Sequence, residues 1–290
     1  MSVSDEEQQI NWDLLSSTLS PNAFAALQGH LISSKGRDRG DGGDKGNNLA
    51  AGSDAVCKNN DSKGAINNAV FKEQDYWEER FAEEEKYDWL LSFEQLQIHL
   101  IPLLNVTERI LIVGCGNSGL SAGLYDAGFK NITNIDFSET VVDKMKIAHS
   151  ELRPLMQWIT MDMTDMNFEL MSFDVVIDKA SMDALMVDEG DVWNPHESTI
   201  DITDRMCSGI SKILKPHGGK FIQLSFAQPH FRTKYLMALN LKNDDGIRVI
   251  DSPYESSSGF CERYGWTLSF TTIDTEAGCL NSFLYVMRMK

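Results

Sequence analysis

Positive charge is scarce in this sequence. Its 290 residues contain 26 lysines and arginines against 43 aspartates and glutamates, which gives a formal net charge of −17. A surface of that sign repels the phosphate backbone of a nucleic acid. We therefore expect no nucleic-acid partner, whereas a basic protein substrate is compatible with this charge balance.

Cysteine pairs and long apolar runs are also missing. The five cysteines lie far apart, without a C-x-x-C pair or a histidine at ligand spacing, so we expect neither a metal site nor a disulfide framework. No apolar run reaches membrane-spanning length, and the acidic N-terminus (Asp5, Glu6, Glu7) lacks the basic residues of a targeting peptide. These absences predict a soluble cytoplasmic protein with no membrane partner, and a monomer by default.

The composition changes near residue 70. Residues 33–68 consist mainly of Gly, Asp, Asn, Ser and Lys, which is too polar to offset the entropy of ordering. Residues 12–31 show only a loose helical pattern. After residue 70, strand-like runs alternate with helical patterns. We therefore expect a largely disordered N-terminal extension over residues 1–70 and one folded domain over residues 71–290.

The folded region has the pattern of parallel β/α units that end in a hairpin. We expect strands at 109–113, 131–135, 157–161, 173–177 and 220–226, and helices at 118–127, 138–151 with Ser138 as N-cap, and 198–214. Two further β-rich runs, 266–273 and 282–289, are separated by a short polar turn without a helix, so they form an antiparallel pair. A mostly parallel α/β, Rossmann-like sheet with a C-terminal antiparallel hairpin is typical of the class I methyltransferases rather than the nicotinamide dehydrogenases.

A glycine-rich motif follows the first of these strands. Residues 114–119 (Gly-Cys-Gly-Asn-Ser-Gly) satisfy G-x-G-x-x-G between a strand and a helix, where the backbone can approach a ligand and a helix N-terminus presents free N–H groups. Asp136 follows Gly116 by 20 positions, at a strand end where a carboxylate would accept hydrogen bonds from ribose hydroxyls. NAD and S-adenosylmethionine both suit this pair, and a tight turn with an ordinary aspartate is the alternative.

Two more strand ends bring polar residues to the same edge of the sheet. Asp162 and Met163 follow the third strand, where an aspartate can accept from an adenine amino group and a methionine can pack on the ring; this favours S-adenosylmethionine. Asp178 and Lys179 close the fourth strand, and Asp183 follows. For each of these last three residues a structural salt bridge is an equal alternative to a functional role.

Taken together, the motifs resemble those of the seven-β-strand protein-lysine methyltransferases. They are Tyr76-Trp77-Glu78-Glu79-Arg80-Phe81, Tyr87-Asp88-Trp89, residues 113–118, residues 174–179 and residues 229–235. The likeness covers residues 74–290. It is greatest to the lysine methyltransferases of translation elongation factor 1A, with the citrate synthase lysine methyltransferase as a near relative. It implies a methyltransferase domain over residues 71–290, S-adenosylmethionine as cofactor, S-adenosylhomocysteine as product, and elongation factor 1A as protein partner.

The resemblance also implies which residues bind the cofactor. They are Trp77, Phe81, Trp89, Gly114, Gly116, Asp136, Phe137, Asp162, Met163 and Lys179. Phe81 stands where family members commonly carry tyrosine. Core packing of an N-terminal helix is the alternative explanation for the aromatic residues.

The acceptor side is predicted from position alone. We expect Asp178 and Asp183 to be the catalytic residues, in the sense that they orient the target amine. His230, Phe231 and Arg232 follow the fifth strand and could border the target side chain, although an ordinary loop histidine is as good an interpretation. An acidic loop with Asp188, Glu189 and Asp191 would attract a basic substrate surface, or is simply solvated.

Three rival functions stay open at this point. A small-molecule methyltransferase would share the cofactor site and differ only in the acceptor pocket. A catalytically silent binding module would act through the N-terminal tail, although the intact glycine motif argues against it. A nicotinamide oxidoreductase is disfavoured by the terminal hairpin.

Overall fold

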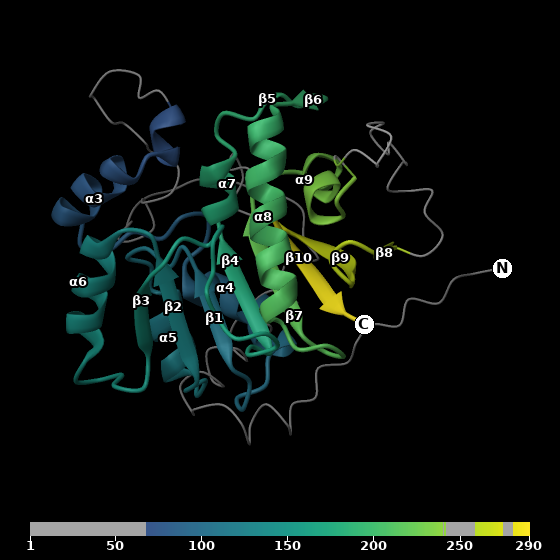
Figure 1. Cartoon of the computed structure of the whole chain (residues 1–290). Helices are drawn as coiled ribbons and strands as arrows, with labels where there is room; N and C mark the ends of the chain where they lie inside the picture. The colour runs from purple at the N-terminus through teal and green to yellow at the C-terminus, as the bar shows by residue number, and fades with distance from the viewer. Residues whose placement is uncertain (1–67, 240, 242–258, 275–280) are drawn as a thin grey trace, which may run out of the picture.

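An eight-stranded mixed sheet lies at the centre of the computed structural model, which describes residues 68–239, 241, 259–274 and 281–290 (Figure 1). The strand order is β3-β2-β1-β4-β7-β10-β9-β8. The strands are β1 (Ile110–Val113), β2 (Ile132–Asp136), β3 (Gln157–Thr160), β4 (Val175–Lys179), β7 (Lys220–Ser225), β8 (Phe260–Cys261), β9 (Trp266–Ile273) and β10 (Ser282–Met289). The first five of the sheet pair in parallel, and β10 is antiparallel to both β7 and β9. The predicted fold class is confirmed.

Helices cover both faces of this sheet. Those that pack against one face are α3 (Gln74–Glu83), α4 (Phe93–Leu100), α5 (Leu120–Asp126) and α6 (Glu139–His149). Those on the other face are α7 (Ser181–Leu185), α8 (Glu197–Ile213) and α9 (Pro229–Leu236). Two short 3-10 helices, η1 (Asn68–Lys72) and η2 (Ile101–Leu103), and a small hairpin of β5 (Gly190–Asp191) and β6 (Asn194–Pro195) complete the described elements.

Strand β1 shows why the sheet needs both helical layers. Successive side chains of a strand point to opposite faces. Ile110 and Ile112 accordingly belong to the core under α4 and α5, and Leu111 and Val113 to the core under α8. All four residues are at most 2% exposed. The uninterrupted apolar run of this segment is therefore the pattern of a central parallel strand.

The predicted elements are found with small differences in their ends. Ser138 caps α6 as predicted, because its Oγ accepts from the Val141 N–H at 3.3 Å. The strand predicted at 173–177 lies instead at Val175–Lys179. Phe173 forms only an isolated bridge, and the Asp174 carboxylate accepts from the Arg109 N–H and from Lys215 Nζ, at 2.9 and 2.7 Å. The backbone of Asp174 nevertheless bonds on both sides, since its N–H donates to the Arg109 carbonyl at 3.0 Å and its carbonyl accepts from the Lys220 N–H at 2.9 Å.

None of α4, α7, α9, the β5–β6 hairpin or β8 was predicted from the sequence. Helix α7 is only five residues long and follows Ala180, which has a left-handed φ of +68°. A helix that short is below the length at which an apolar period is visible. Helix α9 lacks an apolar stripe, although Pro229 at its start is a recognised helix-initiation signal.

Several predictions fall on residues outside the described ones. The predicted extension spans residues 1–70; residues 1–67 of it, with the loose helical pattern at 12–31, lie outside the described residues, whereas residues 68–70 are described and belong to η1. The domain boundary at residue 70 stays a prediction. Among the described residues, Cys115, Cys207 and Cys261 are free and buried. The helices described here are all too short or too polar to span a bilayer.

Removing a buried leucine should cost far more stability than removing an exposed one. Leu100 on α4 is 0% exposed, whereas Leu152 is 75% exposed. We expect Leu100→Ala to lower the free energy of unfolding by about 3 kcal/mol through loss of burial and formation of a cavity. Leu152→Ala should change it by less than about 0.5 kcal/mol. Urea denaturation followed by circular dichroism measures both, and equal losses would contradict this packing.

Candidate active site

The sheet has a switch point between β1 and β4. From β1 the chain turns through the glycine motif into α5 on one face, and from β4 it turns into α7 on the other. The carboxyl ends of β1, β2 and β4 therefore meet at one edge, in register across the ladder. Open α/β sheets bind ligands at such a point because the connections diverge and leave a crevice.

The glycines of the motif adopt conformations that favour glycine. Gly114 and Gly116 have φ values of +56° and +50°. A Cβ on Gly114 would lie 2.2 Å from Ser181 Oγ, and that hydroxyl donates to the Gly114 carbonyl at 3.0 Å. A Cβ on Gly116 would lie 3.5 Å from the Phe81 ring. A side chain at position 114 would therefore clash with Ser181 of α7. At position 116 there is room for a Cβ, and the positive φ is what favours glycine.

Asp136 links the end of β2 to this loop. Its Oδ2 accepts from the Gly116 N–H at 2.9 Å and its Oδ1 from the Ser138 N–H at 3.1 Å. The residue is 4% exposed. Burial raises the pKa of its carboxyl to about 6, although the two backbone hydrogen bonds oppose that rise. Hydrogen bonds therefore fix this carboxyl to the backbone of the glycine loop and to the start of α6.

An aromatic segment lies over the same loop. The rings of Trp77 and Phe81 on α3 stack with centroids 5.3 Å apart, and both side chains are buried. The guanidinium of Arg80 lies 5.1 to 5.7 Å from the ring centroids of Trp77, Tyr87 and Trp89. Because Phe81 also faces Gly116, these rings are packed in the core and at the same time cover the loop.

Lys179, the last residue of β4, is held by the segment after α3. Its Nζ donates to the Trp89 carbonyl at 2.8 Å and to Asp88 Oδ1 at 3.3 Å. Burial lowers the pKa of this ammonium, while the Asp88 carboxylate opposes that fall. Lys179 therefore connects β4 to the aromatic segment.

The residues predicted at the adenine reach the same edge. Asp162 is exposed, and its Oδ1 accepts from the Thr164 N–H at 2.7 Å. The Met163 sulfur lies 3.8 Å from the position of a Cβ on Gly114. Phe137 is half-buried, and its carbonyl accepts from Gln74 Nε2 at 2.8 Å. All ten residues predicted to bind the cofactor thus lie around the ends of β1 to β4, and their roles stay predictions.

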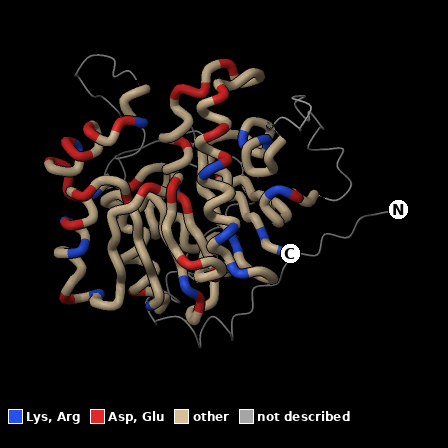
Figure 2. Tube along the Cα trace, in the orientation of Figure 1, with Lys and Arg blue, Asp and Glu red and all other residues tan. Residues whose placement is uncertain are grey.

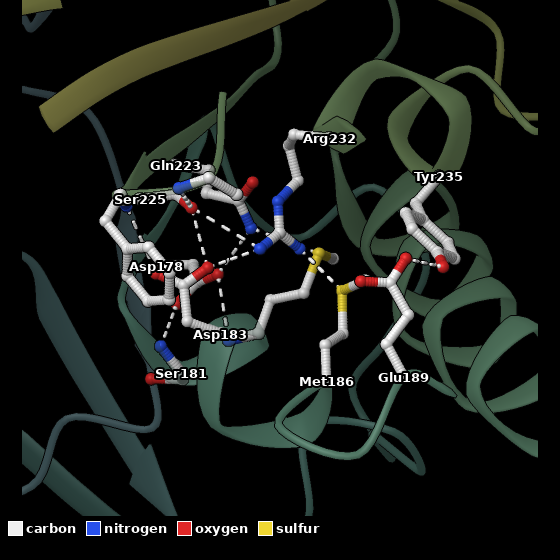
Figure 3. A network of polar contacts seen from close by, with 12 residues as sticks. Asp178, Ser181, Asp183, Met186, Glu189, Gln223, Ser225, Arg232 and Tyr235 are labelled. Carbon is white, nitrogen blue, oxygen red and sulfur yellow. Dashed lines mark hydrogen bonds and ion pairs between the residues drawn. The ribbon is translucent and has the colours of Figure 1, made fainter. Parts of the chain in front are cut away.

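A buried polar network continues from β4 toward α9 (Figure 3). Asp178 is fully buried, and its carboxylate accepts from the Ser181 N–H at 2.8 Å and from Gln223 Nε2 at 2.7 Å. Asp183 accepts from Ser225 Oγ at 2.6 Å and pairs with the Arg232 guanidinium. Burial raises the pKa of both carboxyls, that of Asp178 to about 6.

A cavity of about 470 Å³ opens beside this network. It is lined by Asp183, Met186, Val187, Asp188, Glu189, Gly190, Val192, Phe226, Ala227, Phe231 and Arg232. Its walls therefore combine acidic side chains with exposed apolar ones, and it lies at the carboxyl end of β7, next to β4. A cationic side chain with an aliphatic stem would match both kinds of surface.

Some of the predicted catalytic and substrate residues line this cavity and others do not. Asp183, Phe231 and Arg232 line it, whereas Asp178 and His230 are not among its lining residues. His230 is exposed, with its ring 3.7 Å from the Phe231 ring. Arg232 is 3% exposed and bound to Asp183, so it forms part of the cavity wall.

Sequence reasoning missed several residues that organise the edge. Asp88 accepts from Ser118 Oγ at 2.6 Å and from the Gly119 N–H at 3.1 Å, in addition to Lys179. Glu78 on α3 accepts from Ser138 Oγ and the Thr140 N–H, at 2.9 and 3.1 Å. Because the chain contains many acidic residues, neither Asp88 nor Glu78 stood out in the sequence as a residue of the site. Only the position of Asp88 between two aromatic residues could have marked it.

Comparison with known proteins gives consistent matches. Residues 110–218 match the methyltransferase domain family. The mouse protein "EEF1A lysine methyltransferase 4" is 37% identical over 171 residues, 58% of this chain and 66% of that protein. The human "eEF1A lysine and N-terminal methyltransferase" is 39% identical over 166 residues, 57% of this chain and 23% of that protein. The chain thus spans less than two thirds of either relative's length.

A solved structure with a similar fold is a TehB-like SAM-dependent methyltransferase from Corynebacterium glutamicum. It is 15% identical, with a TM-score of 0.44, and the match covers 75% of this chain and 98% of that one. The strand order is that of the predicted class I methyltransferase fold, and residues 110–218 within it match the methyltransferase domain family. The two relatives are named for lysine methylation of elongation factor 1A, in agreement with the resemblance of the motifs to the seven-β-strand protein-lysine methyltransferases.

The buried carboxylate of Asp136 should make the stability of the protein depend on pH. Its pKa of about 6 lies above the value of about 3.9 in an unfolded chain, so the folded state favours the protonated form. The stability that this group contributes is present below pH 4 and is lost as the pH rises through 6. Asp136→Asn removes this titration, so wild type should lose stability relative to the variant between pH 5 and 7.5, by on the order of 1 kcal/mol.

Thermal or urea unfolding of both proteins at the two pH values measures that difference. Asp162→Asn, at an exposed aspartate, is the matched control for the general effect of an aspartate-to-asparagine replacement on stability. A wild-type minus Asp136→Asn difference that is the same at pH 5 and pH 7.5 would contradict the raised pKa.

Proposed function

We propose that this protein transfers a methyl group from S-adenosylmethionine to a lysine ε-amine of a protein substrate, and that the substrate is translation elongation factor 1A. The observation that carries the proposal is the position of the two halves of the site. The glycine loop and its acidic residues lie on one side of the β1–β4 switch point, and an acidic, partly apolar cavity lies beside β4 and β7. The matched relatives, which are named for lysine methylation of that factor, support the choice of substrate.

The residues of the edge fit an adenosyl cofactor. Asp136 Oδ2 accepts from the Gly116 N–H and Oδ1 from the Ser138 N–H, and since a carboxylate oxygen has two lone pairs, a ribose hydroxyl could also donate to this carboxylate. The Asp162 carboxylate is exposed beside Met163, where an adenine amino group and ring would find a hydrogen-bond acceptor and an apolar contact. Phe81 and Trp77 would exclude water from the loop. When bound, S-adenosylmethionine supplies a sulfonium methyl group for transfer.

The cavity residues would act on the acceptor lysine in two ways. Asp188 and Glu189 stand at the cavity wall, where they pair with Lys72 and Lys234 at 3.1 Å each, and an incoming ammonium group would compete with these two lysines for the carboxylates. Farther along the wall, Asp183 is already neutralised by Arg232 and hydrogen-bonded to Ser225. A lysine beside this neutral pair and the apolar Met186 and Phe226 side chains would lose hydration.

Deprotonation of that lysine is the chemical requirement of the reaction. A free lysine has a pKa of about 10.4, and only the neutral amine is a nucleophile. Desolvation in the cavity disfavours ammonium, so the amine would release its proton to solvent before transfer. Alignment of the amine by Asp183 would then supply much of the acceleration. Asp178, which is bonded to Ser181 and Gln223, would hold the position of α7 and stays a predicted catalytic residue.

Removal of the exposed carboxylate at the predicted adenine site should weaken cofactor binding. We expect Asp162→Ala to raise the dissociation constant for S-adenosylmethionine roughly tenfold, the value of one hydrogen bond to a charged group. Asp165→Ala, an exposed aspartate in the same turn, is the matched control and should leave binding unchanged. Isothermal titration calorimetry measures both variants, and equal effects would remove Asp162 from the site.

The proposed reaction is tested with tritiated S-adenosylmethionine and purified elongation factor 1A. We expect label in the factor, and mass spectrometry of its peptides should place the added methyl groups on lysine. The same assay with a metabolite extract tests the rival acceptor class. Label in small molecules alone would select a metabolite methyltransferase, and cofactor binding without transfer to any acceptor would select the silent binding module.

A further inference from the structure

The β5–β6 hairpin carries the most exposed large apolar side chain among the described residues. Trp193 lies between the two strands and is 80% exposed, and its neighbour Val192 is 37% exposed. The hairpin stands at the end of α8, beyond the carboxyl edge of the sheet (Figure 1). An exposed tryptophan leaves a large apolar surface in contact with water, which is unfavourable. Exposed apolar surface of this kind can mark a site of contact with another molecule.

The hairpin holds Trp193 in a fixed place. Asp191 Oδ1 accepts from the backbone N–H groups of Trp193 and Asn194, at 2.8 and 3.1 Å. The Trp193 ring meets the Phe231 ring of α9 edge-on, with centroids 6.0 Å apart. Lys234 of α9 also donates to the Val192 carbonyl. The indole is thus tied to α9 while most of its surface faces solvent.

The surface formed by Trp193 and Phe231 adjoins the acceptor cavity. Phe231 and Val192 line that cavity, and so do Asp188 and Glu189 of the preceding loop. Figure 2 shows acidic residues along the hairpin and this loop. The cavity could take one lysine side chain. The indole of Trp193 lies outside the cavity, so it could contact only other residues of the polypeptide that carries this lysine.

We propose that Trp193 and Phe231 form a docking surface for the protein substrate, which contacts an apolar side chain close to the target lysine while the lysine enters the cavity. This inference rests on the proposed function and names the substrate class: a basic protein segment with an apolar residue beside its lysine. Charge complementarity supports that partner, since the chain carries a net charge of −17 and the three carboxylates of the loop and hairpin (Asp188, Glu189 and Asp191) exceed the two lysines, Lys72 and Lys234, that pair with the first two. An exposed, positioned tryptophan is the residue type that most often dominates a protein interface.

The test measures binding and transfer separately, with purified elongation factor 1A as the probe. We expect Trp193→Ala to raise the dissociation constant for the factor about tenfold and to raise the KM for the factor equally. The kcat should stay within about twofold of wild type. Trp193→Phe keeps a flat apolar ring and should stay within about threefold of wild type. Leu152→Ala, which removes an equally exposed apolar side chain on the loop after α6, is the matched control and should change nothing.

Each outcome is informative. An unchanged dissociation constant for Trp193→Ala, an equal loss for Leu152→Ala, or no binding of the factor by the wild-type protein would overturn the docking surface. Binding by wild type that depends on Trp193, but without any methyl transfer, would leave the docking surface standing and overturn the proposed reaction. An unchanged melting temperature and an unchanged affinity for S-adenosylmethionine show that Trp193→Ala is folded.

Discussion

The geometry of the site depends on the carboxylate of Asp88, which joins three parts of the chain. One of its oxygens accepts from Lys179 at the end of β4, from the Ser118 hydroxyl and from the Gly119 N–H of the glycine motif. Lys179 is buried, and an unpaired buried ammonium would be costly. The aromatic segment that carries Asp88 therefore cannot leave the glycine loop without the loss of a buried ion pair.

Helix α7 couples the two halves of the site, although it has only five residues. Asp178 accepts from the first N–H groups of this helix, and Ser181 packs against Gly114, so the start of α7 is fixed to the glycine loop. Two residues later Asp183 reaches the cavity and its Arg232 partner. A displacement of the glycine loop would therefore also displace Asp183 at the cavity, because α7 connects the two.

The sequence was sufficient for most of the sheet and for the edge at which the residues of the predicted cofactor half lie. Apolar β-branched runs, a glycine motif and strand-terminal aspartates are local features, and each is visible in a window of a few residues. Pairings between distant residues are not contained in such a window: Arg232 and Asp183 at the cavity are 49 positions apart, and Lys179 and Asp88 at the glycine loop are 91 apart. Arg232 could be placed near the substrate from its strand, but its burial in an ion pair required the folded chain.

The place of β10 in the sheet sets an order of events during synthesis. β9 pairs with β8 and β10, and β10 alone joins them to β7 and the parallel strands. A nascent chain that has been translated only through β9 contains β8 and β9 but not β10, so these two strands cannot yet join the rest of the sheet. Trp266 and Tyr285, both 0% exposed in the folded protein, can then be buried together only after residues 282–289 have left the ribosome. Until that moment the edge of β7 is open, and a chaperone that shields strand edges would have its target there.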